Sequence, residues 1–528
     1  MKRNLLIFIL VLLFSITKAQ GEFITTWKPA TIQNASNQGT VPSTSTQIWF
    51  PVLGTNFTIY WEEVGYPAHN ATLDNVTSTD NVLIEFGIPH NPNTASAMYT
   101  VKVSQGNGNF HRIRFKDNDP GNMFYGDSSK IFEINQWGNT VWSSMHGAFT
   151  SCQNLDMLAT DVPDLTECTT MYSMFSGCEK LVGNSSMNSW DTSRITDMTA
   201  TFGGCRVFNQ NISNWDTGNV TIMAIMFLLA EKFNQPIDNW NTSNVQYMNA
   251  MFQNAKVFNQ PIGNWDVGNV EEFELTFMMA KAFNQDIGNW NTSSAIEMNS
   301  MFTGASAFNQ NISNWNTSNV TKMQNMFQSA TSFNQNIGNW NTSNVMYMNS
   351  MFQNATAFNQ NLGNWNLNSV TNALTMLLNS GLNCQNYDST LYGWRMNPVT
   401  PNNINLGSVL PLVYATDAAA TARDYLIGIK NWTILNDVND RECSSFLATQ
   451  ENVQQTIIKI YPNPASDYLY VTDSGKILQF QITDLSGRLY RREKMISDKI
   501  NIQDLSTGNY ILQLETKEKT HTFKFLKK

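Results

Sequence analysis

The sequence is poor in charged residues and in histidine, and each shortage argues against a class of function. Asp, Glu, Lys and Arg make up 14% of the 528 residues, and the formal net charge is −9. Nucleic-acid binding needs clustered Lys and Arg, so this balance argues against it. There are five histidines, none in a recognisable catalytic motif, and the six cysteines lack the close pairing of a zinc site. We therefore expect no catalytic residue, no metal and no cofactor.

Long apolar runs are missing except at the start of the chain. Two basic residues precede an apolar run over 5–14, and small residues follow it. This run is too short for a permanent membrane helix and is typical of a removable secretory signal over 1–19, cleaved between Ala19 and Gln20. No later stretch is long and apolar enough to span a bilayer. We expect an exported mature chain without a transmembrane segment.

What the sequence does have is an internal repeat. Tryptophan recurs every 25 residues without an insertion, and Phe-Asn-Gln recurs in the same register. The tryptophans are Trp190, Trp215, Trp240, Trp265, Trp290, Trp315, Trp340 and Trp365. In one unit, apolar residues from Val320 to Ala330 are spaced by three and four, which indicates one face of a short helix. The Asn-Gln-x-Ile-Gly-Asn-Trp segment that follows indicates a short strand. One helix and one strand per unit predict an α/β repeat solenoid similar to leucine-rich repeats.

The flanking segments differ from the repeat. Alternating, aromatic-rich segments before it indicate an N-terminal β-domain, and a distinct end module of alternating strands follows at the other end. A helix is expected over 417–429 and a strand over 432–435. The predicted domains are a signal peptide (1–19), a β-rich cap (20–145), the solenoid (146–383), a C-terminal cap (384–447), a linker (448–455) and the end module (456–528).

The repeat unit resembles a known family. Its Asn-Trp-Asn/Asp-Thr-Ser-Asn-Val-x-x-Met-x-x-Met-Phe-x-x-Ala/Cys pattern is similar to the BspA-type leucine-rich repeat of bacterial surface proteins, over roughly 145–385. The resemblance implies a surface protein with a role in adhesion. The unit at Glu271–Glu274 departs from the pattern, with Phe273 in place of Met.

The end module carries a second resemblance. A Tyr-Pro-Asn-Pro motif, a Gly-containing hairpin turn, a Gly-x-Tyr segment and a basic end together resemble the type IX secretion C-terminal sorting domain. This resemblance implies that the end module is a small C-terminal β-sandwich. The motif residues are Tyr461, Pro462, Asn463, Pro464, Gly487, Gly508 and Tyr510. The resemblance implies that the type IX secretion machinery is a partner. It also implies that the mature chain is released or held at the outer face of the outer membrane.

The residue after each repeat tryptophan is the candidate ligand-binding position. The candidates are Asp191, Asp216, Asn241, Asp266, Asn291, Asn316, Asn341 and Asn366. Carboxylates two units apart would lie about 9.6 Å from each other, just outside the window of about 5–9.5 Å for glycosidase pairs. Alternation of Asp and Asn fits a turn cap equally well.

Four further patterns have two interpretations each. The tryptophans form either an exposed platform for sugars or a buried row, and burial is favoured because exposed aromatic patches of that size are rare. The threonines that follow them form an ice-binding array or helix caps, and capping is favoured. The Met-x-x-Met steps suggest copper ligands or core packing, and packing is favoured. Residues 117–122 form a calcium loop or a plain turn, and the turn is favoured because the distal Glu is missing.

The cysteines divide into two groups. Cys152, Cys178 and Cys205 occupy a repeat position that is otherwise Ala, so small buried residues are expected there. Cys384 and Cys443 flank the C-terminal cap, and we treat a disulfide between them as a hypothesis for an oxidising compartment.

Together these patterns predict a secreted or surface-attached, non-catalytic binding protein. Its ligand is an unknown extracellular protein or polysaccharide, and the contact surface is the strand face of the repeats. Two alternatives stay open: an enzyme that acts on polysaccharide, and a self-associating component of a surface layer.

Overall fold

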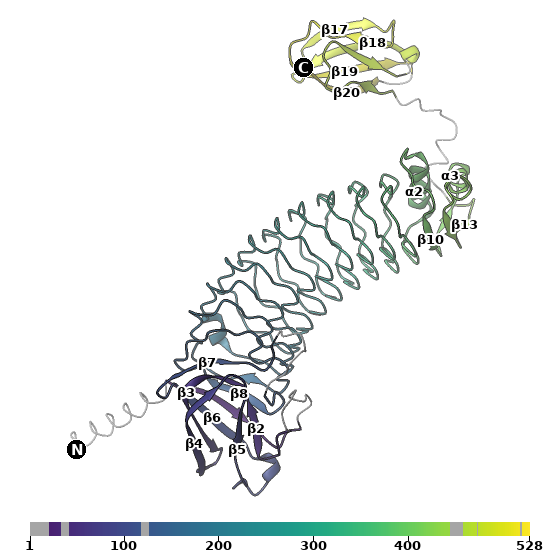
Figure 1. The fold of residues 1–528 in the computed structure, drawn as a ribbon. Coiled ribbons are helices and arrows are strands. Elements are labelled where there is room, and N and C mark those ends of the chain that lie inside the picture. Colours follow the sequence, from purple (N-terminus) through teal and green to yellow (C-terminus); the bar gives the residue numbers. More distant parts are fainter. Residues whose placement is uncertain (1–20, 33–41, 118–125, 444–457, 473, 518–519) are drawn as a thin grey trace, which may run out of the picture. The chain divides into compact units, whose positions relative to one another are not determined.

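The chain forms two compact units, residues 1–445 and 446–528, each with its own hydrophobic core (Figure 1). This computed structural model describes residues 21–32, 42–117, 126–443, 458–472, 474–517 and 520–528. The predicted signal peptide with its cleavage site at Ala19 and Gln20, and the predicted linker, lie outside the described residues. No helix in the described part of the chain has the length and apolar composition needed to cross a membrane.

A seven-stranded sheet opens the first unit. Its order is β4-β3-β6-β1-β8-β9 with β7 also paired to β3, and β2 and β5 form a separate antiparallel pair. The strands are β1 (Phe23–Trp27), β2 (Gln47–Phe50), β3 (Val52–Glu63), β4 (Tyr66–Ser78), β5 (Val82–Glu85), β6 (Tyr99–Ser104), β7 (Asn109–Ile113), β8 (Ile131–Gln136) and β9 (Asp156–Met157), with a 3-10 turn, η1 (Thr94–Ser96), before β6. The β8–β9 pair is parallel and joins this sheet to the first repeats. Sheet and repeats therefore share one continuous core.

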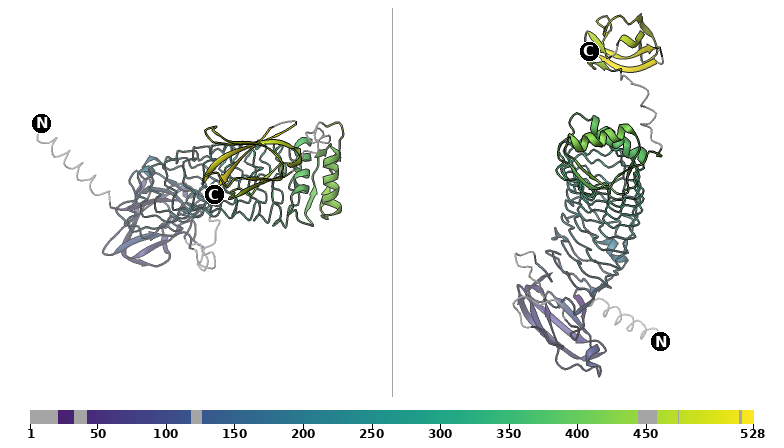
Figure 2. Two further views of the ribbon diagram at one scale, coloured as in Figure 1. Left: turned by 90° about the horizontal axis from the view of Figure 1, so that it is seen from above. Right: turned by 90° about the vertical axis from the view of Figure 1, so that its right-hand side faces the viewer.

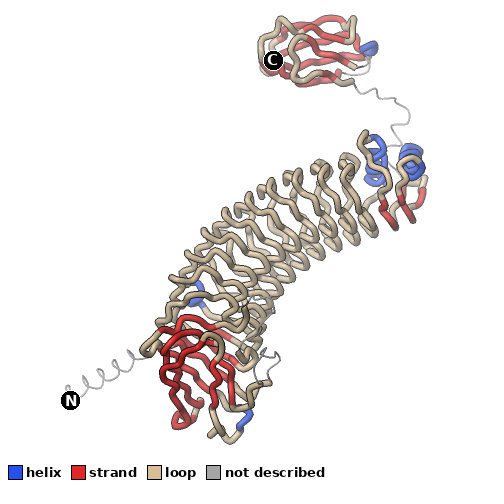
Figure 3. The backbone as a smooth tube through the Cα atoms, viewed as in Figure 1, coloured by secondary structure: helices blue, strands red, loops and turns tan. Residues whose placement is uncertain are grey.

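The repeats do not form the predicted α/β solenoid, and that prediction is wrong. In Figure 3 the stacked units after η2 (Ser185–Ser189) are drawn as loops and turns up to α2 (Cys384–Met396). In the unit that contains Val320, Asn325 and Ser329 both have a φ of 57°. Residues in this left-handed region interrupt a right-handed helix, so the helix expected between Val320 and Ala330 is absent.

Backbone hydrogen bonds explain why the spacing of the apolar residues predicted a helix that does not form. The amides of Met326 and Ala330 each donate to the carbonyl three residues earlier, as in successive tight turns. The amides of Met323 and Phe327 instead donate to Tyr347 and Met351 of the next unit, both at 2.9 Å. Apolar side chains still reach the core every three or four residues, but half of the amides bond between units. Spacing alone does not distinguish this arrangement from a helix.

The units are joined along one surface by single parallel β-bridges. From Asp197 to Asn372, each bridge connects residues 25 positions apart. The bridges lie at the start of the segment predicted to be helical, whereas the segment predicted to be a strand, such as 334–340, contains no strand. We call the outward side chains of residues 196–204, 221–229, 246–254, 271–279, 296–304, 321–329, 346–354 and 371–379 the bridged face.

Two helices and two short parallel strand pairs end the first unit. They are α2, β10 (Asn405–Ser408), β11 (Val413–Tyr414), α3 (Asp417–Gly428), β12 (Thr433–Leu435) and β13 (Val438–Asn439). The predicted helix over 417–429 and strand over 432–435 are confirmed. Trp394 of α2 donates its indole N–H to Leu362 O at 3.0 Å, so α2 covers the last repeat (Figure 2).

The second unit, residues 446–528, contains two small sheets. One has the order β14-β15-β18 and the other β17-β16-β19-β20. The strands are β14 (Ile460–Tyr461), β15 (Tyr468–Val471), β16 (Ile477–Asp484), β17 (Leu489–Lys494), β18 (Lys499–Asn501), β19 (Gly508–Thr516) and β20 (Thr520–Lys527), with a 3-10 turn, η4 (Ser474–Lys476), before β16. Alternate residues, such as Leu512 and Leu514 of β19, are fully buried.

Candidate functional site

The predicted ligand-binding residues sit in the equivalent turn of each unit, where all are exposed except the half-buried Asn366. In each unit the side-chain Oδ1 of this Asp or Asn accepts the backbone N–H two residues further on, as Asn316 does from Ser318 at 3.1 Å. The same bond is made by Asp191, Asp216, Asn241, Asp266, Asn291, Asn341 and Asn366. Hydrogen bonds from Ser193 lower the pKa of Asp191. One oxygen of each side chain therefore supports the turn, and ligand binding by these residues stays a prediction.

The threonine in the same turn is buried and bonds between units. Thr317 is 1% exposed, and its hydroxyl donates to Asn341 O of the next unit at 2.9 Å. Equivalent bonds are made by Thr192, Thr217, Thr242, Thr292 and Thr342. Neither a helix cap nor an exposed hydroxyl array describes these residues, because there is no helix to cap and the hydroxyls are inside the stack.

The repeat tryptophans are buried, and none is more than 4% exposed. Several of their rings stack on the tryptophan of a neighbouring unit, with centroids 6.3 Å apart for Trp315 and Trp340. From Trp215 onward, each indole N–H donates to a carbonyl 28 residues earlier. The tryptophans therefore form a core row and offer no platform to a sugar ring.

Sequence reasoning missed a ladder formed by the Asn and Gln of Phe-Asn-Gln. Asn309 Oδ1 accepts the backbone N–H of Asn334 at 2.9 Å and the side-chain amide of Gln335 at 2.9 Å. The same pattern recurs with Asn234, Asn259, Asn284 and Asn334 as acceptors. Each amide side chain thus replaces the bonds that a regular strand would make. The signal was in the sequence, because this polar pair hardly varies between units.

The bridged face behaves differently, because its residues vary while the scaffold stays constant. At the bridge position the successive residues are Asp197, Ile222, Tyr247, Glu272, Glu297, Lys322, Tyr347 and Asn372. Acidic, basic, aliphatic and aromatic side chains occupy one structural position, with Tyr347 39% exposed. Such variation shows that the stack does not require one chemistry there.

Carboxylates gather in the middle of this face. Burial and then the neighbouring charges of Glu297, Glu274 and Glu271 raise the pKa of Glu272. Lys322 pairs with Glu297 at 2.5 Å. The ion pairs found among the described residues do not include Glu271, Glu272 or Glu274. This part of the surface consequently has an excess of negative charge.

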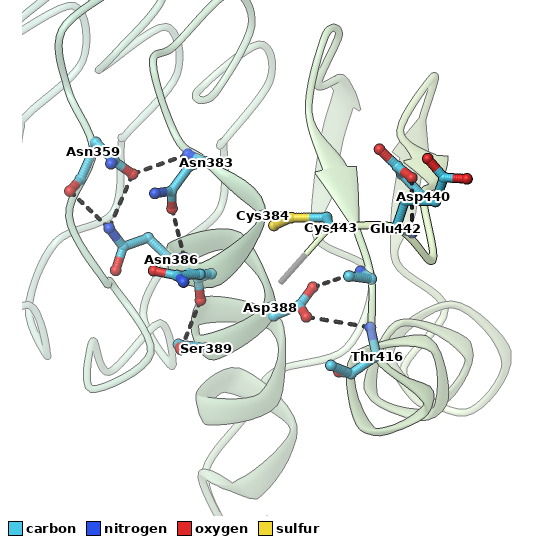
Figure 4. The surroundings of a disulfide bond; sticks show 12 residues. Asn359, Asn383, Cys384, Asn386, Asp388, Ser389, Thr416, Asp440, Glu442 and Cys443 are labelled. Carbon is cyan, nitrogen blue, oxygen red and sulfur yellow. Dashed lines mark hydrogen bonds between the residues drawn. A yellow bond between two sulfur atoms is a disulfide. The ribbon is translucent and has the colours of Figure 1, made fainter. Parts of the chain in front are cut away.

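The cysteines are either buried or paired. Burial raises the pKa of Cys152, Cys178 and Cys205. Cys384 and Cys443 form a disulfide with their Cα atoms 6.5 Å apart, which ties α2 to the end of the first unit (Figure 4). Among the described residues, no three His, Cys, Asp or Glu side chains are grouped as a metal site would require. Most of the calcium candidate at 117–122 lies outside the described residues.

The predicted sorting motifs lie at strand ends and turns of the second unit. The Asn463 side chain donates to Lys524 O and accepts from the Leu526 amide, at 3.0 and 2.9 Å. Gly487 has a φ of 87° in the turn between β16 and β17, a conformation that favours glycine. Tyr510 is 3% exposed and donates its hydroxyl to Ser506 O at 3.0 Å. These motifs hold the β20 end and the turns in place.

Two family profiles match the chain, and no curated protein does. The first is described as Mycoplasma protein of unknown function, DUF285, and it matches residues 118–185, 169–290 and 272–394. The second is described as a secretion system C-terminal sorting domain and matches 459–528. This second match confirms the predicted type IX sorting domain and identifies the chain as a secreted or cell-surface protein. Because the first profile covers more than half of the sequence, the chain belongs to the DUF285 family of surface repeats.

Proposed function

We propose that the chain is a non-catalytic binding protein of the bacterial surface, and that its bridged face contacts an extracellular protein or polysaccharide. The observation that carries the proposal is the contrast between positions. Tryptophan, threonine and Phe-Asn-Gln positions are nearly constant because they pack or bond between units. Bridge positions such as Ile222, Tyr247 and Lys322 differ in chemistry although their backbones are equivalent. Side chains that the fold does not need are available to a ligand.

The length of the face supports this assignment. Neighbouring bridged segments are about 4.8 Å apart, so the eight bridge positions from Asp197 to Asn372 span roughly 35 Å. A surface of this length offers many weak contacts in a row to an extended ligand. Export through the sorting domain brings the face into contact with such ligands.

The test is a retention assay with residues 21–445, the unit that has its own core. The protein is applied to immobilised polysaccharides and matrix proteins, and both retention and released soluble products are scored. A bridged-face variant, Tyr247→Ser with Tyr347→Ser, is compared with a control at exposed positions elsewhere, Asn314→Ala with Thr331→Ala.

We expect retention on at least one surface, no released products, and at least tenfold weaker retention for the bridged-face variant alone. Released sugars or peptides would contradict the non-catalytic assignment. Equal retention of both variants would place the contact away from the bridged face, and no retention on any surface would contradict a binding function.

A further inference from the structure

Two units of the bridged face carry apolar rows that their neighbours lack. One row is Ile225, Leu228 and Leu229, and the other is Leu275, Met278 and Met279. All six side chains are partly exposed. The unit between the rows has Ala250, Gln253 and Asn254 at the same positions, and the unit beyond has Ser300, Thr303 and Gly304. Apolar rows thus alternate with rows of small or polar side chains.

Equivalent units have small or polar residues in place of these apolar residues. Ile225 and Leu275 have φ values of 63° and 59°, and Leu229 and Met279 both have 58°. The left-handed region is costly for residues with a side chain and most of all for a β-branched one. Asn325, in an equivalent unit, has the same conformation at lower cost. The sequence therefore places strained apolar side chains at a surface where a polar residue fits better, and such strain is typical of functional positions.

The negative charges beside the second apolar row indicate which chemical class of partner fits this face. Glu272 and Glu274 lie on the same segment as Leu275, and Glu297 is the bridge partner of Glu272. Apolar and acidic side chains therefore lie within a few residues of each other on this face. Anionic lipid and nucleic acid would be repelled by these carboxylates. The rows are aliphatic and not aromatic, so they lack the flat rings that stack on sugars.

We propose that the two rows, with the adjacent carboxylates, bind a polypeptide segment that carries both apolar side chains and Lys or Arg. This inference rests on the proposed function and names the class of ligand for the same face. Units are about 4.8 Å apart, so the two rows are about 10 Å from each other, with a row of smaller side chains between them. The partner buries the six apolar side chains, and its cations neutralise Glu272 and Glu274.

The experiment measures binding of three fluorescein-labelled 14-residue peptides to the purified chain by fluorescence anisotropy. One peptide alternates Leu and Lys, the second Leu and Glu, and the third Ser and Lys. The row variant is Leu228→Gln with Met278→Gln, and it is tolerated by the fold because Gln253, Gln328 and Gln353 occupy the same position. The charge variant is Glu272→Gln with Glu274→Gln. The control is Asn314→Ala with Thr331→Ala, at two exposed positions outside the bridged face.

We expect the Leu/Lys peptide to bind at least tenfold more tightly than the other two. The row variant should weaken binding at least tenfold, the charge variant at least threefold, and the control not at all. Hydrogen exchange in 222–229 and 271–279 should slow on binding. Equal affinity of the row variant and the control overturns the inference, as does a concentration-dependent dimer in sedimentation that the row variant abolishes.

The result of this experiment can be distinguished from the result of the retention assay that tests the proposed function. If a polysaccharide retains the chain but the row variant binds the Leu/Lys peptide as tightly as the control does, the inference fails and a binding function stands. If the peptide binds through the rows but no matrix surface retains the chain, the proposed extracellular ligands are wrong and the inference stands.

Discussion

The indole N–H of Trp315 lies 3.0 Å from the carbonyl oxygen of Ile287, which belongs to the preceding unit. The same carbonyl also accepts the amide of Trp290 at 3.2 Å. One oxygen thus connects a turn within its own unit to a ring in the next. The tryptophan is constant in the sequence because it packs in the core and also bonds between units.

Replacing Trp315 with Phe should lower the free energy of unfolding by about 2 kcal/mol, because it removes this bond and leaves a small cavity. Urea denaturation followed by circular dichroism measures the change. Asn314→Ala, at the exposed neighbour, should change stability by less than about 0.5 kcal/mol. Equal effects of the two substitutions would contradict the assignment of Trp315 to the core.

The carboxyl group of Glu63 should make the stability of the N-terminal sheet depend on pH. Burial alone would raise its pKa, but hydrogen bonds from His69 Nδ1 and from the amides of His90 and Asn91 lower it below the usual 4.5. A carboxyl with a lowered pKa stabilises the fold above its unfolded pKa, and this contribution is lost as the pH falls through the folded value.

Glu63→Gln should therefore cost about 2 kcal/mol at pH 7 and progressively less below pH 4.5. Denaturant titrations of both proteins at pH 7 and pH 3.5 provide the test. A cost that does not change between the two pH values would show that the charge of Glu63 is not what stabilises the sheet.

The Cys384–Cys443 disulfide closes a loop across 59 positions, and by loop entropy it contributes about 4 kcal/mol at most. Cys443→Ser should lower the melting temperature and increase hydrogen exchange in α2 and α3. Repeats far from α2 should exchange as before, because contacts in a stack are local. Mass analysis of the oxidised chain that finds both thiols free would contradict the pairing.

Ile225→Asn should raise the free energy of unfolding by about 1 kcal/mol, because Asn adopts the left-handed conformation more easily than Ile. Ile222→Asn serves as the comparison, since residue 222 is not left-handed, and it should not stabilise. Thermal unfolding of the two variants is sufficient to measure this. A destabilised Ile225→Asn variant would mean that Ile225 serves the fold and not a ligand.

Part of the fold follows from the sequence and part does not. The 25-residue period and the apolar pattern identify the core correctly, because side-chain burial depends only on which residues point inward. The helix was wrong because residues such as Asn325 and Ser329 adopt the left-handed conformation, and nothing in the local sequence marks those positions. The selection comes from amides that bond to the next unit, such as Met323 to Tyr347, and a single segment does not contain that partner.

The same limit applies to the candidate site. The turn residues such as Asn316 stand out because they alternate between Asp and Asn, yet their Oδ1 supports the turn. The bridged face was missed because it fell on the expected helix. Its signal is the variation at Ile222, Tyr247 and Glu272 within an otherwise constant unit. A comparison of the repeats with each other identifies variable surface positions. A search for residue types typical of binding or catalysis does not identify them.

The bonds between units also bear on how such a chain changes over generations. Thr317 donates its hydroxyl to Asn341 O, and Thr292 makes the same bond to Asn316 O, so the unit between them receives from one side what it supplies to the other. Recombination between two repeats in the gene adds or removes 25 residues and leaves every remaining junction matched. The reach of the molecule can therefore be lengthened or shortened in single steps, while both ends keep their partners.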